Sequence, residues 1–385
     1  MRFLFASDSF KGSLSSEKTA ELLEQSAEKY FPGCTCIKVP VADGGEGTAD
    51  VVIKAAGGKK VFVQDHDPYM NPIEAYYGVV NEKTVILDMS VASGLPLIPK
   101  EKRDPELTTS YGTGELIRAA LDSGYRDIII ALGGSATNDG GMGAMAALGV
   151  RFLDDRNQPV KGIGANLIKV KQIDTQEIDP NVKDASFTVI CDVKNPLCGH
   201  RGATYTFGRQ KGGTPEKLKN LENGMCSYQN ILKQYSGYDV ELIEGGGAAG
   251  GLGAALKIFL KAEMKSGIEE VLTLIDFDEK LKGVDLVVTG EGNLDFQSVY
   301  GKVISGVGRH CQAKGIPVVA VTGGISENYE GIAEFGIQGV VTTVNAAMDI
   351  EYAMDHAENL YRNAADRLFA LLRVGIEIGE KRHEP

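Results

Sequence analysis

Acids, hydroxyl groups, glycines and one lysine follow four short apolar runs of this 385-residue sequence. In chain order they are Asp8, Ser9, Lys11 and Ser13, then Asp43 and Glu46, then Glu291, Asn293 and Asp295, then Thr322, Gly323 and Gly324. Carboxylate oxygens are typical Mg²⁺ ligands, and hydroxyl groups with a lysine can hold a phosphate or a carboxylate. The group together favours phosphoryl transfer to an alcohol, although any one of these acids alone is more often a helix cap.

Two glycine-rich segments in the middle of the chain could bind a nucleotide through backbone N–H groups. The first, 131–143 (ALGGSATNDGGMG), lies between an apolar run and a helical pattern, as an anion-binding loop does. It lacks the Gly-Lys-Ser/Thr ending of a P-loop. The second, 244–256, contains a G-x-G-x-x-G pattern. The candidate nucleotide contacts are Gly133, Gly134, Ser135, Thr137 and Asn138 in the first segment and Gly245, Gly247 and Gly250 in the second.

The G-x-G-x-x-G pattern also supports a rival function, an NAD-linked hydroxy-acid dehydrogenase. That reading needs a strand at 239–244 before the glycines and a second strand at 271–278 after them. Asp276 or Asp278 would then bind the ribose. Their separation from the glycines exceeds the usual spacing of about 20 residues, so the pattern is weak evidence.

Segment 191–213 supplies a local cluster of positive charge in a chain whose net charge is −12. Asp192 follows an apolar run and is a candidate for deprotonating a hydroxyl group, and Lys211 is a candidate for binding an anionic substrate. Cys191, Cys198 and His200 have a spacing that fits no common zinc site, so we expect packed thiols there.

Composition limits the class of protein. The net charge of −12 argues against nucleic-acid and anionic-membrane partners. Six cysteines without regular pairing favour a reducing cytoplasm, and no apolar stretch approaches the length of a membrane span. Small-molecule substrates are the expected partners, and a homodimer is compatible with the sequence.

Strand and helix patterns alternate at both ends of the chain. Apolar runs at 2–7, 35–42, 285–289, 317–321 and 338–344 predict buried strands, and Ser16 is the expected cap of the first helix. This alternation predicts an α/β fold with a doubly wound parallel sheet formed by residues 1–58 and 283–385. Residues 59–282 are expected to form a second, inserted α/β domain.

Eight blocks of sequence, taken together, resemble the type I family of bacterial glycerate kinases. They are SDSFKGSLS, VPVADGGEGT, RDPELTTSYGTGELI, ALGGSATNDGGMGAMAALG, CDVKNPLCG, GATYTFGRQKGG, GGGAAGGLGAAL and VVTGEGNLDFQS, in this order along nearly the whole chain. The resemblance implies ATP-dependent phosphorylation of D-glycerate with Mg²⁺, and 2-phosphoglycerate rather than 3-phosphoglycerate as the product. It also implies a flavodoxin-like domain with an inserted α/β domain and an active site in the cleft between them.

The chain departs from the family pattern at two places. Ser7 stands where the family usually has proline, and Asn293 and Phe296 stand where it usually has arginine and serine. Losing the arginine removes a fixed cation, which leaves a noncatalytic glycerate-binding protein as a third reading.

The candidate residues take the following roles in the kinase reading. Lys11, Ser9 and Ser13 hold the carboxylate of glycerate or the γ-phosphate, and Asp43 and Lys211 also contact the substrate. Asp43, Glu46 and Glu291 are the Mg²⁺ ligands, with Asp295 a further candidate. Lys11, Asp192 and Asp295 are the catalytic candidates, with Asp192 as the base.

Overall fold

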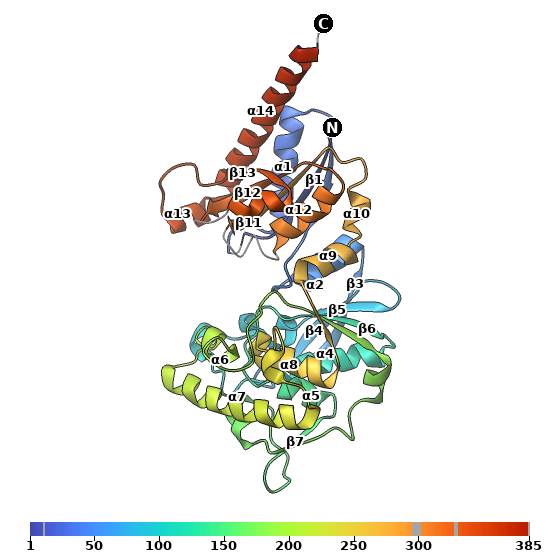
Figure 1. Ribbon diagram of the computed structural model, residues 1–385, viewed down its shortest axis with the longest axis vertical. Coiled ribbons are helices and arrows are strands. Elements are labelled where there is room, and N and C mark those ends of the chain that lie inside the picture. Colours follow the sequence, from blue (N-terminus) through green and yellow to red (C-terminus); the bar gives the residue numbers. More distant parts are fainter. Residues whose placement is uncertain (11, 295–301, 327–329, 384–385) are drawn as a thin grey trace. The chain divides into compact units, whose positions relative to one another are not determined.

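The computed structural model describes residues 1–10, 12–294, 302–326 and 330–383, and Figure 1 shows their path. They form two compact units. The first unit combines both ends of the chain, Met1–Asp43 and Gly267–Pro385, and the second unit is Gly44–Ser266.

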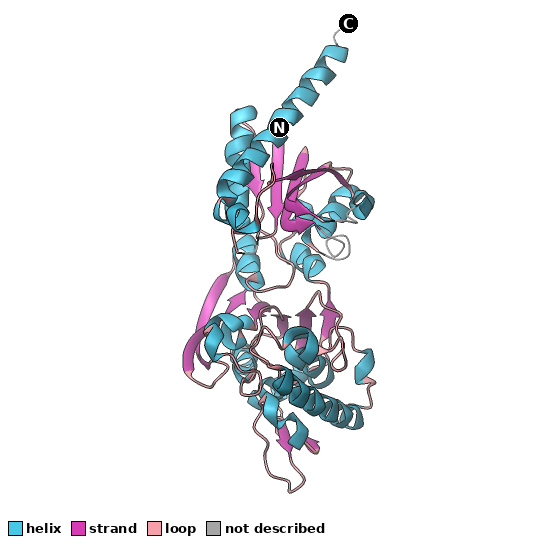
Figure 2. Cartoon of the chain, turned by 90° about the vertical axis from the view of Figure 1, so that its left-hand side faces the viewer, coloured by secondary structure: helices cyan, strands magenta, loops and turns pink. Residues whose placement is uncertain are grey.

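The first unit contains a five-stranded sheet in the order β13-β12-β11-β1-β2, with every neighbouring pair parallel. Its strands are β1 (Arg2–Ser7), β2 (Thr35–Lys38), β11 (Leu286–Leu294), β12 (Val318–Ile325) and β13 (Ile337–Thr342). Its helices are α1 (Ser16–Tyr30), α9 (Gly267–Leu274), α10 (Phe277–Lys280), α12 (Val303–Ala313), α13 (Ile350–Asp355) and α14 (Ala357–His383), with the 3₁₀ turn η7 (Glu330–Phe335). Helices lie on both sides of this sheet (Figure 2).

The core of the first unit forms around the aromatic side chains of β1. The rings of Phe3 and Phe5 have centroids 5.3 Å and 6.3 Å from that of Phe369 on α14, in edge-to-face geometry. Helix α1 is capped by Ser15, whose side chain accepts from the Lys18 N–H at 3.1 Å. The predicted cap, Ser16, is wrong by one residue.

The second unit contains a six-stranded mixed sheet in the order β10-β9-β6-β5-β4-β3. Strands β10, β9, β6 and β5 are parallel, and β4 and β3 extend the edge antiparallel. Its strands are β3 (Lys59–His66), β4 (Pro72–Val79), β5 (Thr84–Asp88), β6 (Asp127–Ala131), β9 (Ser186–Ile190) and β10 (Glu263–Lys265), with β7 (Arg151–Leu153) and β8 (Gln172–Asp174) forming a separate pair.

Helices and short turns surround this second sheet. The helices are α2 (Thr48–Ala56), α3 (Ser90–Ser93), α4 (Tyr111–Asp122), α5 (Met142–Ala147), α6 (Ala203–Phe207), α7 (Pro215–Ser236) and α8 (Leu252–Phe259). The 3₁₀ turns are η1 (Leu95–Leu97), η2 (Lys100–Lys102), η3 (Gly164–Lys169), η4 (Pro180–Asp184), η5 (Val240–Leu242) and η6 (Ala248–Gly251). One continuous apolar core joins β5, β6 and β9 to α4, α5, α7 and α8.

The units divide at residues 43/44 and 266/267, whereas the sequence placed the boundaries at 58/59 and 282/283. Packing explains both differences. Ile53 of α2 lies so close to Gly78 of β4 that a Cβ at Gly78 would collide with it. Ile268 of α9 packs in the same way on Gly306 of α12. Helix α2 therefore belongs to the second unit, and α9 to the first.

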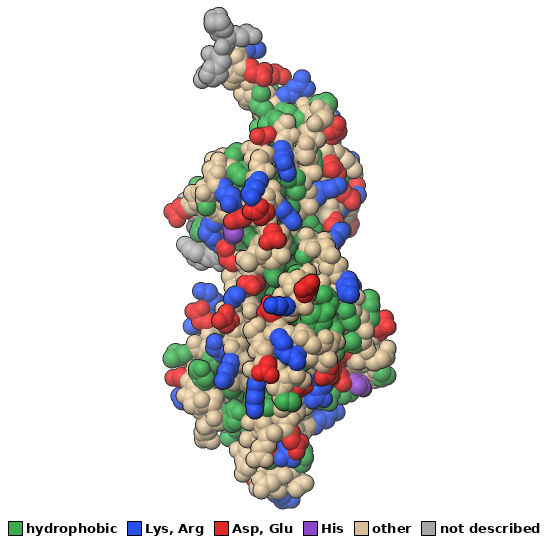
Figure 3. Space-filling model, turned by 90° about the vertical axis from the view of Figure 1, so that its right-hand side faces the viewer, with side chains coloured by type: hydrophobic (Ala, Val, Ile, Leu, Met, Phe, Trp, Pro, Cys, Tyr) green, Lys and Arg blue, Asp and Glu red, His purple; other side chains and the backbone are tan. Residues whose placement is uncertain are grey.

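The surface mixes both signs of charge, as the face in Figure 3 shows. None of the helices in the described part of the chain is long and apolar enough to cross a membrane.

Replacing Phe369 with alanine is expected to lower the free energy of unfolding of the first unit by about 3–5 kcal/mol, because the ring is fully buried and the cavity cannot close. Leu371, two residues further along α14, is 69% exposed, so Leu371→Ala should change stability by less than about 0.5 kcal/mol. Urea unfolding followed by circular dichroism tests both. Equal losses in the two variants would contradict this account of the core.

Candidate active site

The loop after β1 is held in shape by short hydrogen bonds. The Phe10 N–H donates to the Leu14 carbonyl at 2.8 Å, which closes the turn. The Ser16 hydroxyl donates to the Ser7 carbonyl at 2.6 Å, which ties the start of α1 to the end of β1. Ser9 is therefore fixed just beyond the carboxyl end of a central strand, next to β11. In an open parallel sheet this is where ligands bind.

A pocket of about 550 Å³ in the first unit collects side chains from the ends of these strands. Four predicted site residues line it, namely Ser9, Ser13, Asp43 and Glu291. Asp8, Asn293, Gly323 and Gly324, which were also predicted at the strand ends, line it too. The further polar lining residues, which were not predicted, are Lys302, Thr343 and Asp349, together with Gly292. The structure thus brings two predicted Mg²⁺ ligands and two predicted substrate-binding hydroxyl groups to one pocket.

Part of the pocket lining is apolar. Residues on and around α13 contribute to it, including Met348, Ile350, Ala353 and Met354. A pocket lined by both charged and apolar side chains can bind a ligand that has a charged end and a flat hydrophobic end.

Lys302 is the cation among the described residues that line this pocket. The sequence contained a signal for it, since Lys302 follows Gly301 after a strand and loop, but the absence of a following Ser or Thr argued against a P-loop.

Two of the predicted catalytic residues, Lys11 and Asp295, lie outside the described residues. Asn293, which replaces the usual arginine, lies in the pocket beside Ser326, its Nδ2 3.1 Å from the Ser326 hydroxyl.

A second set of predicted residues lies at the carboxyl ends of β5, β6 and β9 in the second unit. Asp88, the last residue of β5, accepts from the Gly47 N–H at 2.7 Å and from the Ser90 hydroxyl at 2.9 Å. Burial raises the pKa of Asp88 to about 6. Asp88 thus fixes the loop that carries Glu46, a predicted Mg²⁺ ligand, whose backbone touches Gly133. Glu46 therefore belongs to the second unit, while Asp43 and Glu291 belong to the first.

The Gly133–Asn138 segment is supported from beneath by Lys211. The Lys211 ammonium is 1% exposed and donates to the Ser135 hydroxyl and the Thr137 carbonyl, each at 2.7 Å. Burial lowers the pKa of Lys211 to about 7. Lys211 therefore holds the loop in place, and its predicted contact with substrate stays a prediction.

The same loop is anchored at its far end by Asp139, which the sequence argument did not single out. The carboxylate is fully buried and accepts from the N–H and hydroxyl of Ser110, each at 2.8 Å, and from the N–H groups of Gly141 and Gly143, each at 3.1 Å. Asn138 is also fully buried and donates to the Thr204 hydroxyl at 3.2 Å. Gly133 and Gly134 are the partly exposed part of the segment.

Gly245, Gly247 and Gly250 are buried and lie against other backbone segments. A Cβ at Gly250 would collide with the Thr137 carbonyl, and one at Gly247 would collide with the Pro196 carbonyl. Their role in nucleotide binding stays a prediction.

The surroundings of these glycines contradict the dehydrogenase reading. The segment predicted as the preceding strand contains only the 3₁₀ turn η5, and the predicted second strand at 271–278 is occupied by α9 and the start of α10. The pattern therefore lacks the strand–turn–helix unit that a dinucleotide needs.

Asp192 is exposed and follows β9, the strand next to β6. Adjacent parallel strands end at the same edge of a sheet, which places Asp192 on the edge that also carries Gly133 and Asp88. Its role as a base stays a prediction.

Parallel α/β sheets that gather acids, hydroxyl groups, glycines and lysines at their strand ends are typical of enzymes with small anionic substrates. The model of the glycerate kinase family matches residues 3–373, and the chain belongs to this family of enzymes. This confirms the resemblance seen in the sequence.

Proteins named glycerate kinase match this chain over nearly their whole length. A glycerate kinase of Bacillus cereus is 41% identical over 378 residues, which are 98% of this chain and 99% of the relative. The glycerate 2-kinase of Escherichia coli is 40% identical over 98% of this chain and 99% of its own. A crystal structure of a Salmonella typhimurium LT2 protein, provisionally named glycerate kinase 2, superposes with a TM-score of 0.84 at 38% identity, covering 98% and 99% of the two chains.

Replacing Lys211 with methionine is expected to change how stability depends on pH. Between pH about 7 and about 10, folded Lys211 is neutral while the unfolded chain keeps the proton, so the unfolded state binds more protons and the free energy of unfolding rises with pH. Lys211→Met removes this rise, whereas Lys219→Met, at an exposed position of α7, keeps it. Urea unfolding at pH about 6.5 and about 9 measures the difference. A parallel pH dependence in Lys211→Met and the wild type would show that the lysine is not buried in solution.

Proposed function

We propose that this chain transfers the γ-phosphoryl group of ATP to D-glycerate, with Mg²⁺ as the bound ion and 2-phosphoglycerate as the product. Membership of the glycerate kinase family supports the acceptor, and the name of the Escherichia coli relative, a glycerate 2-kinase, supports the position of transfer. The observation that carries the proposal is the first-unit pocket, where Asp43 and Glu291 lie with Lys302 at the ends of parallel strands.

We assign the first unit to the flavodoxin-like folds. Counting its strands in chain order gives the sheet order 2-1-3-4-5, which supports this assignment. The order reverses between β1 and β11, and the residues after these two strands line the pocket. The switch point is the position at which this class of sheet binds its ligand.

Asp43 and Glu291 are suited to hold Mg²⁺, because both offer carboxylate oxygens in one pocket. When bound, the ion neutralises charge on the phosphate oxygens. Lys302 and the backbone of Gly323 and Gly324 can bind the same phosphates. The apolar lining around Ile350 is suited to the adenine ring.

Ser9 and Ser13 line this pocket and, with Lys11 between them in the sequence, are our candidates for binding the γ-phosphate. In the second unit, the N–H groups of Gly133 and Gly134 are our candidates for an anionic oxygen of the substrates. Asp192 is our candidate for accepting the proton of the glycerate hydroxyl as the oxygen attacks phosphorus in line.

An assay of product formation distinguishes the proposed kinase reaction from glycerate binding without turnover. The purified protein, D-glycerate, ATP and MgCl₂ should yield ADP and a phosphoglycerate, and chelating the metal should stop the reaction. In the ³¹P NMR spectrum, a phosphate on the secondary carbon couples to a single proton and a phosphate on the primary carbon to a pair. A doublet supports 2-phosphoglycerate, a triplet would overturn the proposed position, and saturable binding without ADP would overturn the kinase reaction.

Glu291→Gln should reduce kcat by at least about 100-fold, because it keeps the shape of the side chain but removes the charge that holds the ion. Asp43→Asn should act in the same direction. Glu334→Gln is the matched control, since Glu334 is an exposed acid of the same unit outside the pocket lining.

Steady-state kinetics over a range of MgCl₂ concentrations tests these variants, and thermal unfolding checks that each is folded. Both pocket variants should need more Mg²⁺ for half-maximal rate. Folded Glu291→Gln and Asp43→Asn proteins with wild-type kcat would exclude the two acids as ion ligands.

A further inference from the structure

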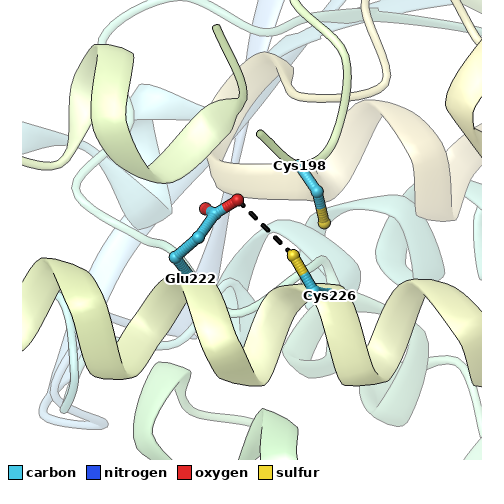
Figure 4. Close-up of side chains that lie close together, drawn as sticks. All are labelled: Cys198, Glu222 and Cys226. Atoms are coloured by element: carbon cyan, nitrogen blue, oxygen red, sulfur yellow. Dashed lines mark hydrogen bonds between the residues drawn. The ribbon is translucent and has the colours of Figure 1, made fainter. Parts of the chain in front are cut away.

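Two thiols and a carboxylate of the second unit come together in a cluster that the proposed reaction does not use (Figure 4). Cys198 lies in the loop between β9 and α6, and Glu222 and Cys226 lie one turn apart on α7. One ligand atom from each side chain lies within 4.8 Å of those of the other two. We call these three residues the Cys198–Glu222–Cys226 cluster.

The spacing of the cluster suits a tetrahedral metal ion. Bond lengths of about 2.3 Å to sulfur and about 2.1 Å to oxygen place sulfur and oxygen about 3.6 Å apart and two sulfurs about 3.8 Å apart. The Cys226 Sγ lies 3.5 Å from Glu222 Oε1. Because the remaining pairs are within 4.8 Å, side-chain movements of about 1 Å would complete the three-ligand arrangement.

Hydrogen bonds orient the carboxylate of Glu222 toward the thiol of Cys226, as a metal-binding carboxylate would be oriented. Only 6% of the residue is exposed, and its Oε1 accepts from the Gly199 N–H at 2.6 Å as well as from the Cys226 thiol. A hydrogen bond of this kind orients a ligating carboxylate. Its Oε2 is buried without a hydrogen-bond partner among the described residues. A buried carboxylate that is only partly satisfied is costly, and a cation would remove that cost.

Metal binding at these two thiols needs no oxidant. A divalent cation displaces the two S–H protons to water and forms two metal–sulfur bonds, so no oxidation state changes. A disulfide between Cys198 and Cys226 would instead need an oxidant.

We propose that Cys198, Glu222 and Cys226 bind one thiophilic divalent cation of the Zn²⁺ class, with water in the fourth position. The ion would tie the loop that contains Asp192 to α7 and so stabilise the second unit. This site is distinct in chemistry from the oxygen ligands of the first unit, and it does not rest on the proposed function.

Co²⁺ is the probe, because thiolate ligands give it an intense near-ultraviolet charge-transfer band and a tetrahedral site gives it visible bands. The reference protein is the full chain with Cys34→Ser and Cys36→Ser, since these two thiols at the start of β2 lie 3.6 Å apart and could compete for the ion. We expect both bands to saturate at one equivalent of Co²⁺ and to disappear when Zn²⁺ is added. A Co²⁺ site made of oxygen ligands alone would give no charge-transfer band.

Adding Cys226→Ser or Cys198→Ser to the reference protein should abolish the charge-transfer band, and adding Glu222→Gln should weaken Zn²⁺ binding by at least about 10-fold. Zn²⁺ should raise Tm of the reference protein but not of the folded Cys226→Ser variant. If Cys198→Ser fails to fold, the other two variants decide. No charge-transfer band in the reference protein, a band that survives Cys226→Ser, or loss of two hydrogens by intact mass, which reveals a disulfide, would each overturn the proposal.

Discussion

The buried ammonium group of Lys211 is the constraint on which the second unit's strand-end loops depend. A charged or neutral amine with almost no exposure to water must give its hydrogens to protein oxygens. Here the acceptors are Ser135 and the Thr137 carbonyl, so the lysine fixes the loop after β6. Asp88 and Asp139 fix loops as acceptors instead of donors. Each buried carboxylate accepts hydrogen bonds from N–H and hydroxyl groups of neighbouring loops. The loops at the strand ends are therefore held by one buried amine and two buried carboxyl groups.

Such an arrangement has a functional consequence. Loops held by buried amine and carboxyl groups cannot relax without leaving those groups unsatisfied, which costs more than losing an ordinary surface hydrogen bond. Gly133 and Gly134 are thus presented on a rigid base, and Glu46 is fixed beside them through Gly47. Preorganised donors of this kind are what phosphoryl transfer requires, since the protein's part in the reaction is chiefly positioning and charge stabilisation.

Local sequence patterns predicted the elements but not the pairing of distant groups. The strand over 2–7 and the helix after it could be predicted, because a run of buried side chains and a Pro-Gly stop act within a few residues. The strand-end rule also placed Ser9, Asp43 and Glu291 together, since parallel strands end at one edge. Lys302 was not predicted to lie in the pocket, because its position there depends on how α12 packs. The contact between Cys226 and Cys198 was not predicted, because Cys198 lies 28 residues earlier in the sequence and only the packing of α7 brings the two together.

The G-x-G-x-x-G segment shows why a glycine pattern alone is ambiguous. Glycine is required wherever backbone approaches backbone, as well as where it approaches a phosphate. In this chain the Gly140 N–H donates to the Gly250 carbonyl at 2.9 Å, and Gly250 adopts a positive φ of 68° against Thr137. The pattern therefore joins two glycine-rich loops of the same unit. Its spacing matches that of a dinucleotide site because both situations need a tight turn before a helix, and only the preceding strand distinguishes them.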